Sequence, residues 1–308
     1  MNNPRSRRNR HSAGLAGRLR ALVGSDGEVA DAATPEELDR AVERFRAAGV
    51  DVVGVNGGDG TGHFVLTALA RAYGPAPLPR LLLLRGGAMN TVAHGHGIKG
   101  GPERILRDVL LKVRHGFPLR TTPRDLLRIS ADGGAPRYGF IFGTGSIVVA
   151  FLDAYYATGR PTPAVAAALV VRGVASALLG GPFAAALTQR ARLRVTTDGD
   201  EWEDGSYLAV AAASTPDAGF GFRAFQRCGE QPGFFHAVGV TGTVGQVARS
   251  LPRLRRGAPW RRRVAQDEVA RVLELEGDAP RFTVDGDLYP AVSAIRVETG
   301  PAVEIVLP

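Results

Sequence analysis

Two glycine-rich turns in the first third of the chain constrain its fold more than any other feature. The first turn, Asn56-Gly57-Gly58-Asp59-Gly60-Thr61, separates an apolar run at residues 50–55 from an almost wholly apolar helical segment at residues 63–73. The second turn, Gly86-Gly87-Ala88, again follows an apolar run, Leu81–Leu84, and precedes a helix start. Strand, glycine turn and helix in series predict a parallel sheet with right-handed crossovers. We therefore expect an α/β lobe with both turns at the carboxyl edge of its sheet.

Two amphipathic helices are expected to cover this sheet. One follows the capping box Thr34-Pro35-Glu36-Glu37, which has proline at the first helical position, and its apolar residues recur at helical spacing up to Gly49. The other runs from Glu103 to His115 and ends before Gly116, with basic side chains in its last turn. Both patterns agree with an α/β arrangement.

The sequence pattern changes near residue 120. Short β-rich segments punctuated by Asp-Gly turns replace the alternation of strands and helices, which predicts a mostly antiparallel second lobe over residues 121–308 after a first lobe over residues 1–120. A helical insertion near residues 163–189 interrupts the second lobe, either as a buried helical hairpin or as a lid over an acyl-chain groove. We expect the end of the chain to pack back on the first lobe.

Cysteine content and hydropathy exclude several classes of protein. Cys228 is the only cysteine, so the chain forms no internal disulfide and no cysteine-based zinc site. The basic N-terminus lacks the apolar core of a secretory signal. The most apolar stretch, residues 164–187, is interrupted by Arg172 and by Gly180-Gly181-Pro182, and neither half reaches the ~18–20 residues that span a bilayer. We expect a cytoplasmic protein with no disulfide partner.

The net charge of +8 is carried by two arginine clusters. Residues 1–20 hold six arginines and no acidic residue, and residues 251–263 hold another six and no acidic residue. Without these twelve arginines the rest of the chain has a net charge of −4. Basicity confined to two patches, without a basic strand or helix interleaved with aromatic residues, argues against a nucleic-acid partner.

The glycine turns favour a phosphate ligand. Glycine lets an anion approach backbone N–H groups, and the helix that begins there adds the positive end of its dipole. Asp59 in such a turn would repel phosphate unless a divalent cation bridges the two groups, or unless Asp59 takes a proton from a hydroxyl acceptor. Both explanations indicate phosphoryl transfer. A Walker loop is excluded because Gly60-Thr61-Gly62 supplies no lysine, and the dinucleotide pattern G-x-G-x-x-G is absent from the turn.

Four motifs spread over residues 3–287 support this interpretation. Asn56–Thr61 contains G-G-D-G-T, Asn3-Pro4-Arg5-Ser6 opens the chain, Gly86–Thr91 forms the second turn, and Phe282–Asp287 ends in D-G-D. In this order they resemble the G-G-D-G-T, N-P-x-S-G, G-T-G-N and D-G-E motifs of the lipid kinases, the family of the diacylglycerol and sphingosine kinases. The more distant NAD kinases and phosphofructokinases share the G-G-D-G-T motif.

The resemblance implies an ATP-binding α/β lobe, a β-sandwich lobe, and Mg²⁺-dependent transfer of the γ-phosphate of ATP to a lipid hydroxyl. Carried over residue by residue, it gives Asp59 the role of organising the acceptor and the metal, directly or through water. Asp287 takes the place of the family's catalytic glutamate. The other matching residues would contact the nucleotide: Asn3, Ser6, Asn56, Gly57, Gly58, Gly60, Thr61, Gly86, Gly87, Asn90 and Thr91.

Asp287 is one methylene shorter than the glutamate of the family pattern. In-line phosphoryl transfer depends mainly on positioning and charge neutralisation, so a displacement of ~1 Å costs on the order of 10²-fold in rate. From the residues alone, Asp285-Gly286 is a hairpin turn. A structural turn and a catalytic carboxylate are therefore the two alternatives for this segment.

The second arginine cluster surrounds Trp260 and is either a solvated loop or a membrane-facing patch. Anionic headgroups attract each nearby arginine by ~1 kcal/mol, and tryptophan favours the interface between membrane and water. A lipid kinase must reach a substrate in a bilayer, so we expect an anionic membrane surface as partner and a peripheral location at the inner membrane face. The residues expected to face the membrane are Arg255, Arg256, Trp260, Arg261, Arg262 and Arg263.

The sequence therefore predicts an ATP- and Mg²⁺-dependent kinase that acts on a diacylglycerol- or sphingoid-type lipid. Two alternatives stay open. One is a kinase with a soluble substrate, of the NAD-kinase type, which assays with NAD and sugar acceptors distinguish. The other is a non-catalytic nucleotide- or lipid-binding relative, which binds nucleotide without turnover.

Overall fold

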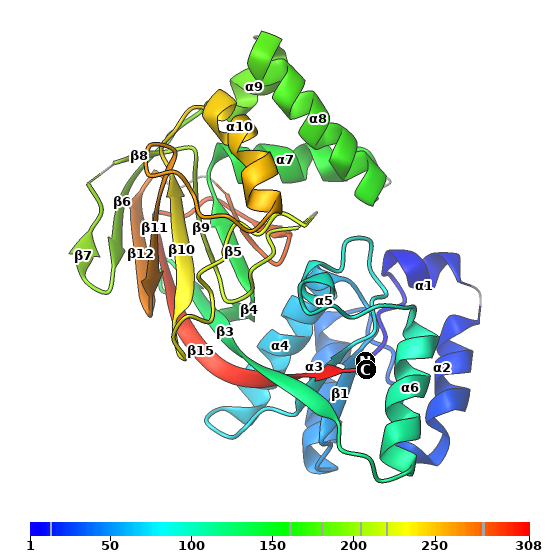
Figure 1. Ribbon diagram of the computed structural model, residues 1–308. Helices are drawn as coiled ribbons and strands as arrows, with labels where there is room; N and C mark the ends of the chain where they lie inside the picture. Colours follow the sequence, from blue (N-terminus) through cyan, green and yellow to red (C-terminus); the bar gives the residue numbers. More distant parts are fainter. Residues whose placement is uncertain (13, 160–161, 180, 204, 220, 279–280) are drawn as a thin grey trace. The chain divides into compact units, whose positions relative to one another are not determined.

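The chain folds into two compact units (Figure 1). A computed structural model describes residues 1–308 except residues 13, 160, 161, 180, 204, 220, 279 and 280. The first unit contains Met1–Leu126 and Pro301–Pro308, and the second unit contains Leu127–Gly300. Two strands, β3 (Arg120–Ala131) and β15 (Ala294–Leu307), each have residues in both units.

The first unit is built on parallel strands, as predicted. β1 (Val52–Val55) lies parallel to β2 (Arg80–Leu83), and the end of β15 lies parallel to β2, with Ile305 opposite Leu81. On the other side of β1, Asn2 forms parallel bridges with the residues at positions 31 and 56. The predicted α/β lobe is therefore confirmed, with the opening residues of the chain inserted beside β1.

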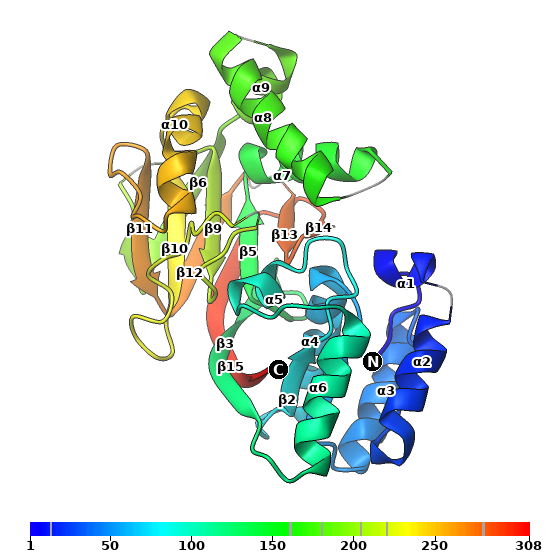
Figure 2. The same cartoon turned by 45° about the vertical axis from the view of Figure 1, so that its right-hand side comes forward.

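Helices cover this sheet. They are α1 (Arg7–His11), α2 (Leu15–Val23), a 3₁₀ turn (Gly24–Asp26), α3 (Pro35–Ala47), α4 (Asp59–Tyr73), α5 (Thr91–Gly95) and α6 (Pro102–Arg114). α3 packs on α4, and α2 packs on α6 (Figures 1 and 2). The predicted capping box is present in α3, where Thr34 Oγ1 accepts from the Glu37 amide at 3.3 Å. α1 and α2 were not predicted, because the arginine cluster obscures the apolar positions Leu15 and Leu19 that α2 buries.

The second unit contains two antiparallel sheets. One has the order β11 (Ala265–Ala270), β10 (Phe235–Val240), β9 (Ala209–Ala213), β5 (Ile141–Thr144), β13 (Phe282–Val284) and β14 (Asp287–Tyr289). The other has the order β15, β12 (Val272–Gly277), β6 (Ala191–Thr197) and β7 (Asp200–Glu201). Three more pairings extend it: β3 lies beside β15, β4 (Arg137–Gly139) beside β3, and β8 (Ser206–Tyr207) beside β6. The expected antiparallel character of this unit is confirmed.

Side chains alternate between two cores in the second unit. The first core cluster takes residues from both sheets, among them Leu273 and Val210. The second core cluster takes the opposite face of β9, with Ala209 and Ala213, together with residues of the covering helices such as Val244. This alternation has the period of two that a strand buried on both faces requires.

Over the residues that the structure describes, the second unit has four helices: α7 (Ser146–Ala157), α8 (Pro163–Leu179), α9 (Pro182–Leu187) and α10 (Val244–Arg255). α8 and α9 fall in the predicted insertion, of which residue 180 lies outside the described residues. α10 was not predicted, and it contains the start of the second arginine cluster. Its signal was the capping box of Thr243 and Gln246, whose reciprocal bonds measure 3.3 and 2.7 Å. In the described part of the chain, no helix has the length and apolar character needed to cross a bilayer.

Candidate active site

The first glycine turn is the beginning of helix α4. Gly58 caps the helix, and Asp59 is its first residue, whereas the sequence predicted helix only from residue 63. The added turn matters because the first backbone N–H groups of a helix, here those of Asp59, Gly60 and Thr61, have no carbonyl partner within it. Such a helix start attracts anions through these amides and the helix dipole.

The second glycine turn follows β2 and is closed by Asn90. Its Oδ1 accepts from the Gly87 amide at 3.0 Å, and its Nδ2 donates to the Gly87 carbonyl at 3.1 Å. Asn90 adopts a left-handed backbone with φ 52°, a conformation that asparagine tolerates better than most residues. Thr91 then begins α5. The amide of Asn90 therefore shapes the turn that the resemblance assigned to nucleotide binding.

The two glycine turns touch each other through their backbones. A Cβ atom on Gly87 would lie 2.1 Å from the Cα atom of Gly58, and a Cβ atom on Gly86 would lie 2.5 Å from Oδ1 of Asn56. Real Cβ atoms do not approach other heavy atoms so closely. Glycine is therefore needed here for the contact between the turns as well as for the approach of a ligand.

Asp59 links the two turns directly. Its Oδ2 accepts a hydrogen bond from the Thr91 amide at 2.9 Å, and its Oδ1 accepts one from the Val92 amide at 3.2 Å. The carboxylate thus caps the N-terminus of α5 from another helix. Burial raises the pKa of Asp59 above its usual value, and the two amide bonds oppose that rise only in part. An acidic group is thereby held in a partly desolvated position, as is common at functional sites.

The opening segment of the chain lies against both glycine turns. Asn3 Nδ2 donates to Thr61 Oγ1 at 2.8 Å, which joins the segment to the first turn. Ser6 Oγ donates to the Gly86 carbonyl at 3.2 Å, which joins it to the second. All the residues that the resemblance assigned to nucleotide binding therefore belong to one connected region of the first unit.

A network of three asparagines supports this region, and the sequence motifs missed two of them. Asn56 Nδ2 donates to Asn2 Oδ1 at 2.7 Å and to Asn9 Oδ1 at 3.0 Å. Asn9 Nδ2 donates to the Asn3 carbonyl at 2.6 Å. Asn56 is 1% exposed, and its Oδ1 has no hydrogen-bond partner among the described residues. Single asparagines at scattered positions carry no sequence signal, so only the fold reveals the network.

A cavity of about 260 Å³ opens beside the first glycine turn. Asn3 and Thr61, which bond to each other, form part of its wall. The rest of the wall is mainly apolar and comes from the segment before α3 and from α3 and α4: Ala32, Ala33, Thr34, Pro35, Leu38, Phe64 and Val65, besides Met1, Asn2 and Arg5. The cavity offers an apolar space next to an anion-attracting helix start.

Protein ligands for a metal are few around these turns. The described residues contain no group of three or more His, Cys, Asp or Glu side chains placed to hold a metal ion. His94 and His96 lie two positions apart, a spacing that a metal pair could use, but both have other partners. His94 has its Nε2 2.8 Å from a guanidinium nitrogen of Arg85, and His96 has its Nδ1 2.8 Å from the Val92 carbonyl. These contacts give the two histidines structural roles.

The C-terminal motif forms a two-residue hairpin turn between β13 and β14. Asp285 and Gly286 occupy the turn with φ values of 48° and 95°. The Asp285 carboxylate accepts from the amides of Phe140 at 3.0 Å and Ile141 at 2.8 Å, and thereby fastens the hairpin to β5 and the residue before it. The turn predicted from Asp-Gly is therefore present, and its aspartate also serves as an anchor.

Asp287 follows this turn as the first residue of β14 and is half-buried. Its carboxylate lies near Tyr289, whose pKa is raised to about 12, mainly by burial and then by the charge of Asp287. The Arg137 guanidinium lies 4.3 Å from the centre of the Tyr289 ring and opposes that rise. Asp287 belongs to the second unit and Asp59 to the first.

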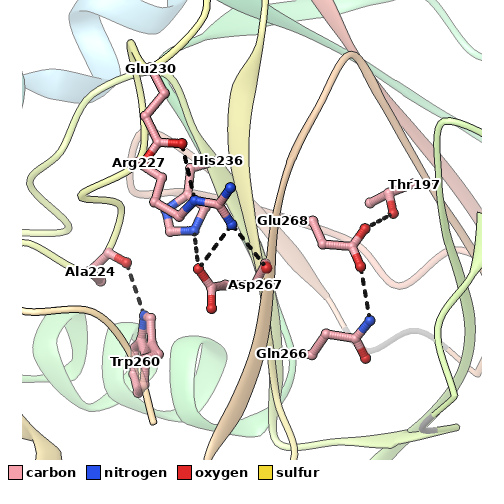
Figure 3. A network of polar contacts seen from close by, with 9 residues as sticks. All are labelled: Thr197, Ala224, Arg227, Glu230, His236, Trp260, Gln266, Asp267 and Glu268. Atoms are coloured by element: carbon pink, nitrogen blue, oxygen red, sulfur yellow. Dashed lines mark hydrogen bonds and ion pairs between the residues drawn. The ribbon is translucent and has the colours of Figure 1, made fainter. Parts of the chain in front are cut away.

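The second arginine cluster lies on the second unit, on the end of α10 and the loop after it. Its five arginines expected to face a membrane are exposed: Arg255, Arg256, Arg261, Arg262 and Arg263. Trp260 differs from them. Its ring packs against the second core cluster, and its Nε1 donates to the Ala224 carbonyl at 2.9 Å (Figure 3). Trp260 thus anchors the loop to the unit, and the arginines alone extend into solvent.

Comparison with known proteins supports the motif assignment. Residues 1–119 match the family model of the diacylglycerol kinase catalytic domain. The resemblance to diacylglycerol kinases is therefore confirmed. The matched domain contains both glycine turns, Asp59 and the asparagine network. No curated protein has a significantly similar sequence.

Solved structures extend the likeness to the whole chain. A candidate diacylglycerol kinase from Bacillus anthracis str. Sterne superposes with a TM-score of 0.67 at 16% identity, over 98% of this chain and 94% of its own. A diacylglycerol kinase from the same organism gives 0.63 at 16% identity, over 98% and 93%. An NAD kinase from Archaeoglobus fulgidus in complex with ATP gives 0.49 at 14% identity, over 96% and 90%. The first two establish that the chain has the diacylglycerol kinase fold.

Proposed function

We propose that the protein is a lipid kinase that transfers the γ-phosphate of ATP to a hydroxyl group of a diacylglycerol- or sphingoid-type lipid. The observation that carries this proposal is Asp59, whose carboxylate sits at the start of α4 and caps α5 across the two glycine turns. A carboxylate held between two helix starts and partly desolvated is suited to phosphoryl transfer, in which the protein contributes positioning and charge. The match of residues 1–119 to the diacylglycerol kinase catalytic domain supports the same function.

The residues around the first glycine turn fit a nucleotide. In this proposal the amides at the start of α4 bind the phosphates, because they carry the positive end of the helix dipole. The apolar cavity bordered by Asn3 and Thr61 takes the base, since it adjoins those amides and offers a flat aromatic wall in Phe64. Asn56, Gly57 and Gly58 hold the turn in place rather than supply charge.

The site also fits Mg²⁺, which binds proteins through one or two carboxylates and completes its shell with water and phosphate oxygens. Asp59 supplies a carboxylate at the start of α4, the type of ligand that Mg²⁺ takes directly or through one of its waters. A bound Mg²⁺ would neutralise charge on the transferred phosphate. Asp59 is the residue proposed to hold it, directly or through water.

A carboxylate must also accept the proton of the attacking hydroxyl. We assign this role to Asp287, whose place in the D-G-D motif corresponds to the glutamate of the family. The anchoring of Asp285 by the amides of Phe140 and Ile141 fixes the turn from which Asp287 extends. Asp285 is thus a positioning residue, and Asp287 the proposed base.

The test is transfer of label from γ-labelled Mg·ATP to lipid. Purified protein is incubated with vesicles that contain diacylglycerol or sphingosine, and with NAD and a sugar mixture in parallel reactions. We expect labelled lipid, and a loss of about 10²–10⁴-fold in Asp59→Asn. Asp51→Asn is the matched control, because Asp51 is exposed just before β1 in the same unit.

Two results would contradict the proposal. Label in NAD or sugar but not in lipid would indicate a soluble-substrate kinase. If the wild type binds nucleotide but transfers label to no acceptor, and the variants Asp59→Asn and Asp51→Asn are equally inactive, the protein is a non-catalytic relative.

A further inference from the structure

The second unit carries an arginine surface without counter-charges. Residues 231–266 contain seven arginines and no acidic residue. They lie on α10 and the loop that follows it, up to the start of β11: Arg249, Arg253, Arg255, Arg256, Arg261, Arg262 and Arg263. We call these seven residues the arginine surface. Among the described residues, none of the seven forms an ion pair with a carboxylate.

Other arginines of the second unit behave differently. Arg128 pairs with Glu298, Arg281 pairs with Asp153, and Arg296 pairs with Glu274. These arginines have an acidic residue within reach, whereas the acid-free segment over residues 231–266 collects seven arginines and supplies no carboxylate. Uncompensated guanidinium groups close together repel one another, so an anionic partner would lower the energy of this surface.

The arginine surface is held on a rigid support. Leu254 of α10 is buried, and its carbonyl accepts from the amide of Arg223 at 3.0 Å. Trp260 packs into the second core cluster and bonds to Ala224 (Figure 3). Arg255 and Arg256 precede this anchor, and Arg261–Arg263 follow it. The guanidinium groups thus extend from a fixed loop, so binding costs less conformational entropy than it would from a mobile tail.

An exposed apolar helix face lies next to this surface. α8 packs on α10, and both views show the two helices together at one end of the second unit (Figures 1 and 2). Ala164, Ala168, Val171 and Ala175 recur at helical spacing and are exposed, and Val171 is 68% exposed. The chain contains no acidic residue over residues 154–197, a range that includes α8 and α9. Exposed apolar side chains beside uncompensated positive charge are typical of helices that lie on membranes.

We propose that the arginine surface and the exposed face of α8 together dock on an anionic lipid bilayer. The arginines bind headgroup phosphates, and the alanine and valine side chains of α8 lie against the boundary between headgroups and acyl chains. The positive charge alone would also suit the phosphates of a nucleic acid. A nucleic-acid backbone, however, has no apolar surface that could cover the exposed face of α8. This docking does not require kinase activity.

The test is co-sedimentation of the full chain, without nucleotide, with vesicles of phosphatidylcholine alone or mixed with phosphatidylglycerol. We expect binding only to the mixed vesicles, and binding that weakens as salt is raised. We expect the triple variant Arg261→Gln/Arg262→Gln/Arg263→Gln to partition onto the mixed vesicles on the order of 10²-fold less than the wild type. Each arginine near an anionic surface contributes about 1 kcal/mol of attraction, and the variant removes three of them. These residues are exposed and unpaired within the described chain, so the variant should fold normally.

Matched controls separate docking from net charge. Arg44→Gln/Arg71→Gln/Arg104→Gln removes the same charge from exposed arginines that already have carboxylate partners, and should change binding little. Val171→Glu should weaken binding, whereas Val113→Glu, at an exposed valine of α6, should not.

Three outcomes would overturn the proposal. The first is that the two triple arginine variants bind vesicles equally well. The second is that Val171→Glu and Val113→Glu change vesicle binding by the same amount. The third is that the wild type binds duplex DNA but not anionic vesicles. Asp59→Asn should bind vesicles like the wild type. Membrane docking and the proposed kinase activity can therefore fail separately.

Discussion

The Asp59 carboxylate accepts a hydrogen bond from the Thr91 amide at 2.9 Å, so the first residue of one helix caps the first turn of another. This bond connects two glycine turns that are about thirty residues apart in the chain and that follow neighbouring parallel strands. It also holds the Asp59 carboxylate at the start of α4, where the helix amides would attract a phosphate. Asp59 is thus both a helix cap and the carboxylate that we propose to be catalytic.

Substitutions of Asp59 should separate these two roles. Asp59→Asn keeps one oxygen to accept from Thr91 or Val92, and it removes the cost of a partly buried charge, so its free energy of unfolding should stay within ~1 kcal/mol of wild type. Asp59→Ala loses the cap altogether and should lose ~0.5–2 kcal/mol. Urea unfolding measures both. Both variants should lose kinase activity by about 10²–10⁴-fold, and an Asp59→Asn variant as active as the wild type would contradict the proposed catalytic role.

Gly87→Ala should destabilise the first unit, because its Cβ atom would lie 2.1 Å from the Cα atom of Gly58. Overpacking of this kind costs ~1–3 kcal/mol, and the movement needed to relieve it would also disturb Asp59. Gly17→Ala is the matched control. Gly17 is exposed in α2, and a Cβ atom added there would meet nothing within 4 Å, so alanine should stabilise the helix by ~0.5–1 kcal/mol. Thermal unfolding compares the two, and equal shifts would contradict the contact between the turns.

Ala33→Phe should weaken ATP binding by filling the cavity beside the first glycine turn. Ala33 lines this cavity, and its backbone amide donates to Glu37 Oε2 at 2.7 Å, a bond that does not depend on the side chain. Loss of one well-packed contact of the base corresponds to about tenfold in Kd, or ~1.4 kcal/mol. Calorimetric titration with ATP measures it. Ala47→Phe, at an exposed position at the end of α3, should leave Kd unchanged, and an unchanged Kd in both would place the base elsewhere.

Asp267 should make the stability of the second unit depend on pH (Figure 3). Burial alone would raise its pKa, but the hydrogen bond from His236 at 2.9 Å and the charge of Arg227 outweigh burial and lower the pKa below its usual value. A carboxylate whose pKa is lower in the folded than in the unfolded chain stabilises the fold above the unfolded pKa of about 3.9, and this contribution is lost as the pH falls through the folded pKa.

The measurement is urea unfolding of wild type and Asp267→Asn between neutral and acid pH. The variant should be less stable by ~1–3 kcal/mol near neutrality, and the difference should shrink at acid pH. Asp200→Asn, at an exposed position of β7, should show neither effect. A difference for Asp267→Asn that stays constant with pH would contradict the assignment.

Local signals in the sequence were sufficient for much of the first unit. The capping box at Thr34 predicted α3, because the bonds it makes join residues only three positions apart. Glycine turns between apolar runs predicted parallel strands with the turns at one edge. The predicted start of α4 was four residues late. Glycine has a low helix propensity, so the glycines of the first turn of α4 indicated a loop in the sequence.

Other features had no local signal. Asn2 and Asn9 join Asn56 only because the opening residues of the chain insert beside β1. Trp260 looked like a membrane anchor in the sequence, and the structure uses it as a packing residue because a core cluster lies beneath its loop. The capping of α5 by Asp59 joins residues 32 positions apart, which no pattern of neighbouring residues can indicate.

The sequence by itself determined several elements, such as α3 and α6, the order of the motifs and the acid-free segments, since these depend on residues close together in the chain. The tertiary structure decided which groups meet. It brought two glycine turns into backbone contact, turned Asp59 into a cap for a helix that is not its own, and set α8 beside α10. Such contacts arise only when strands pair and helices pack, because burial of apolar faces is what selects one set of long-range neighbours among many.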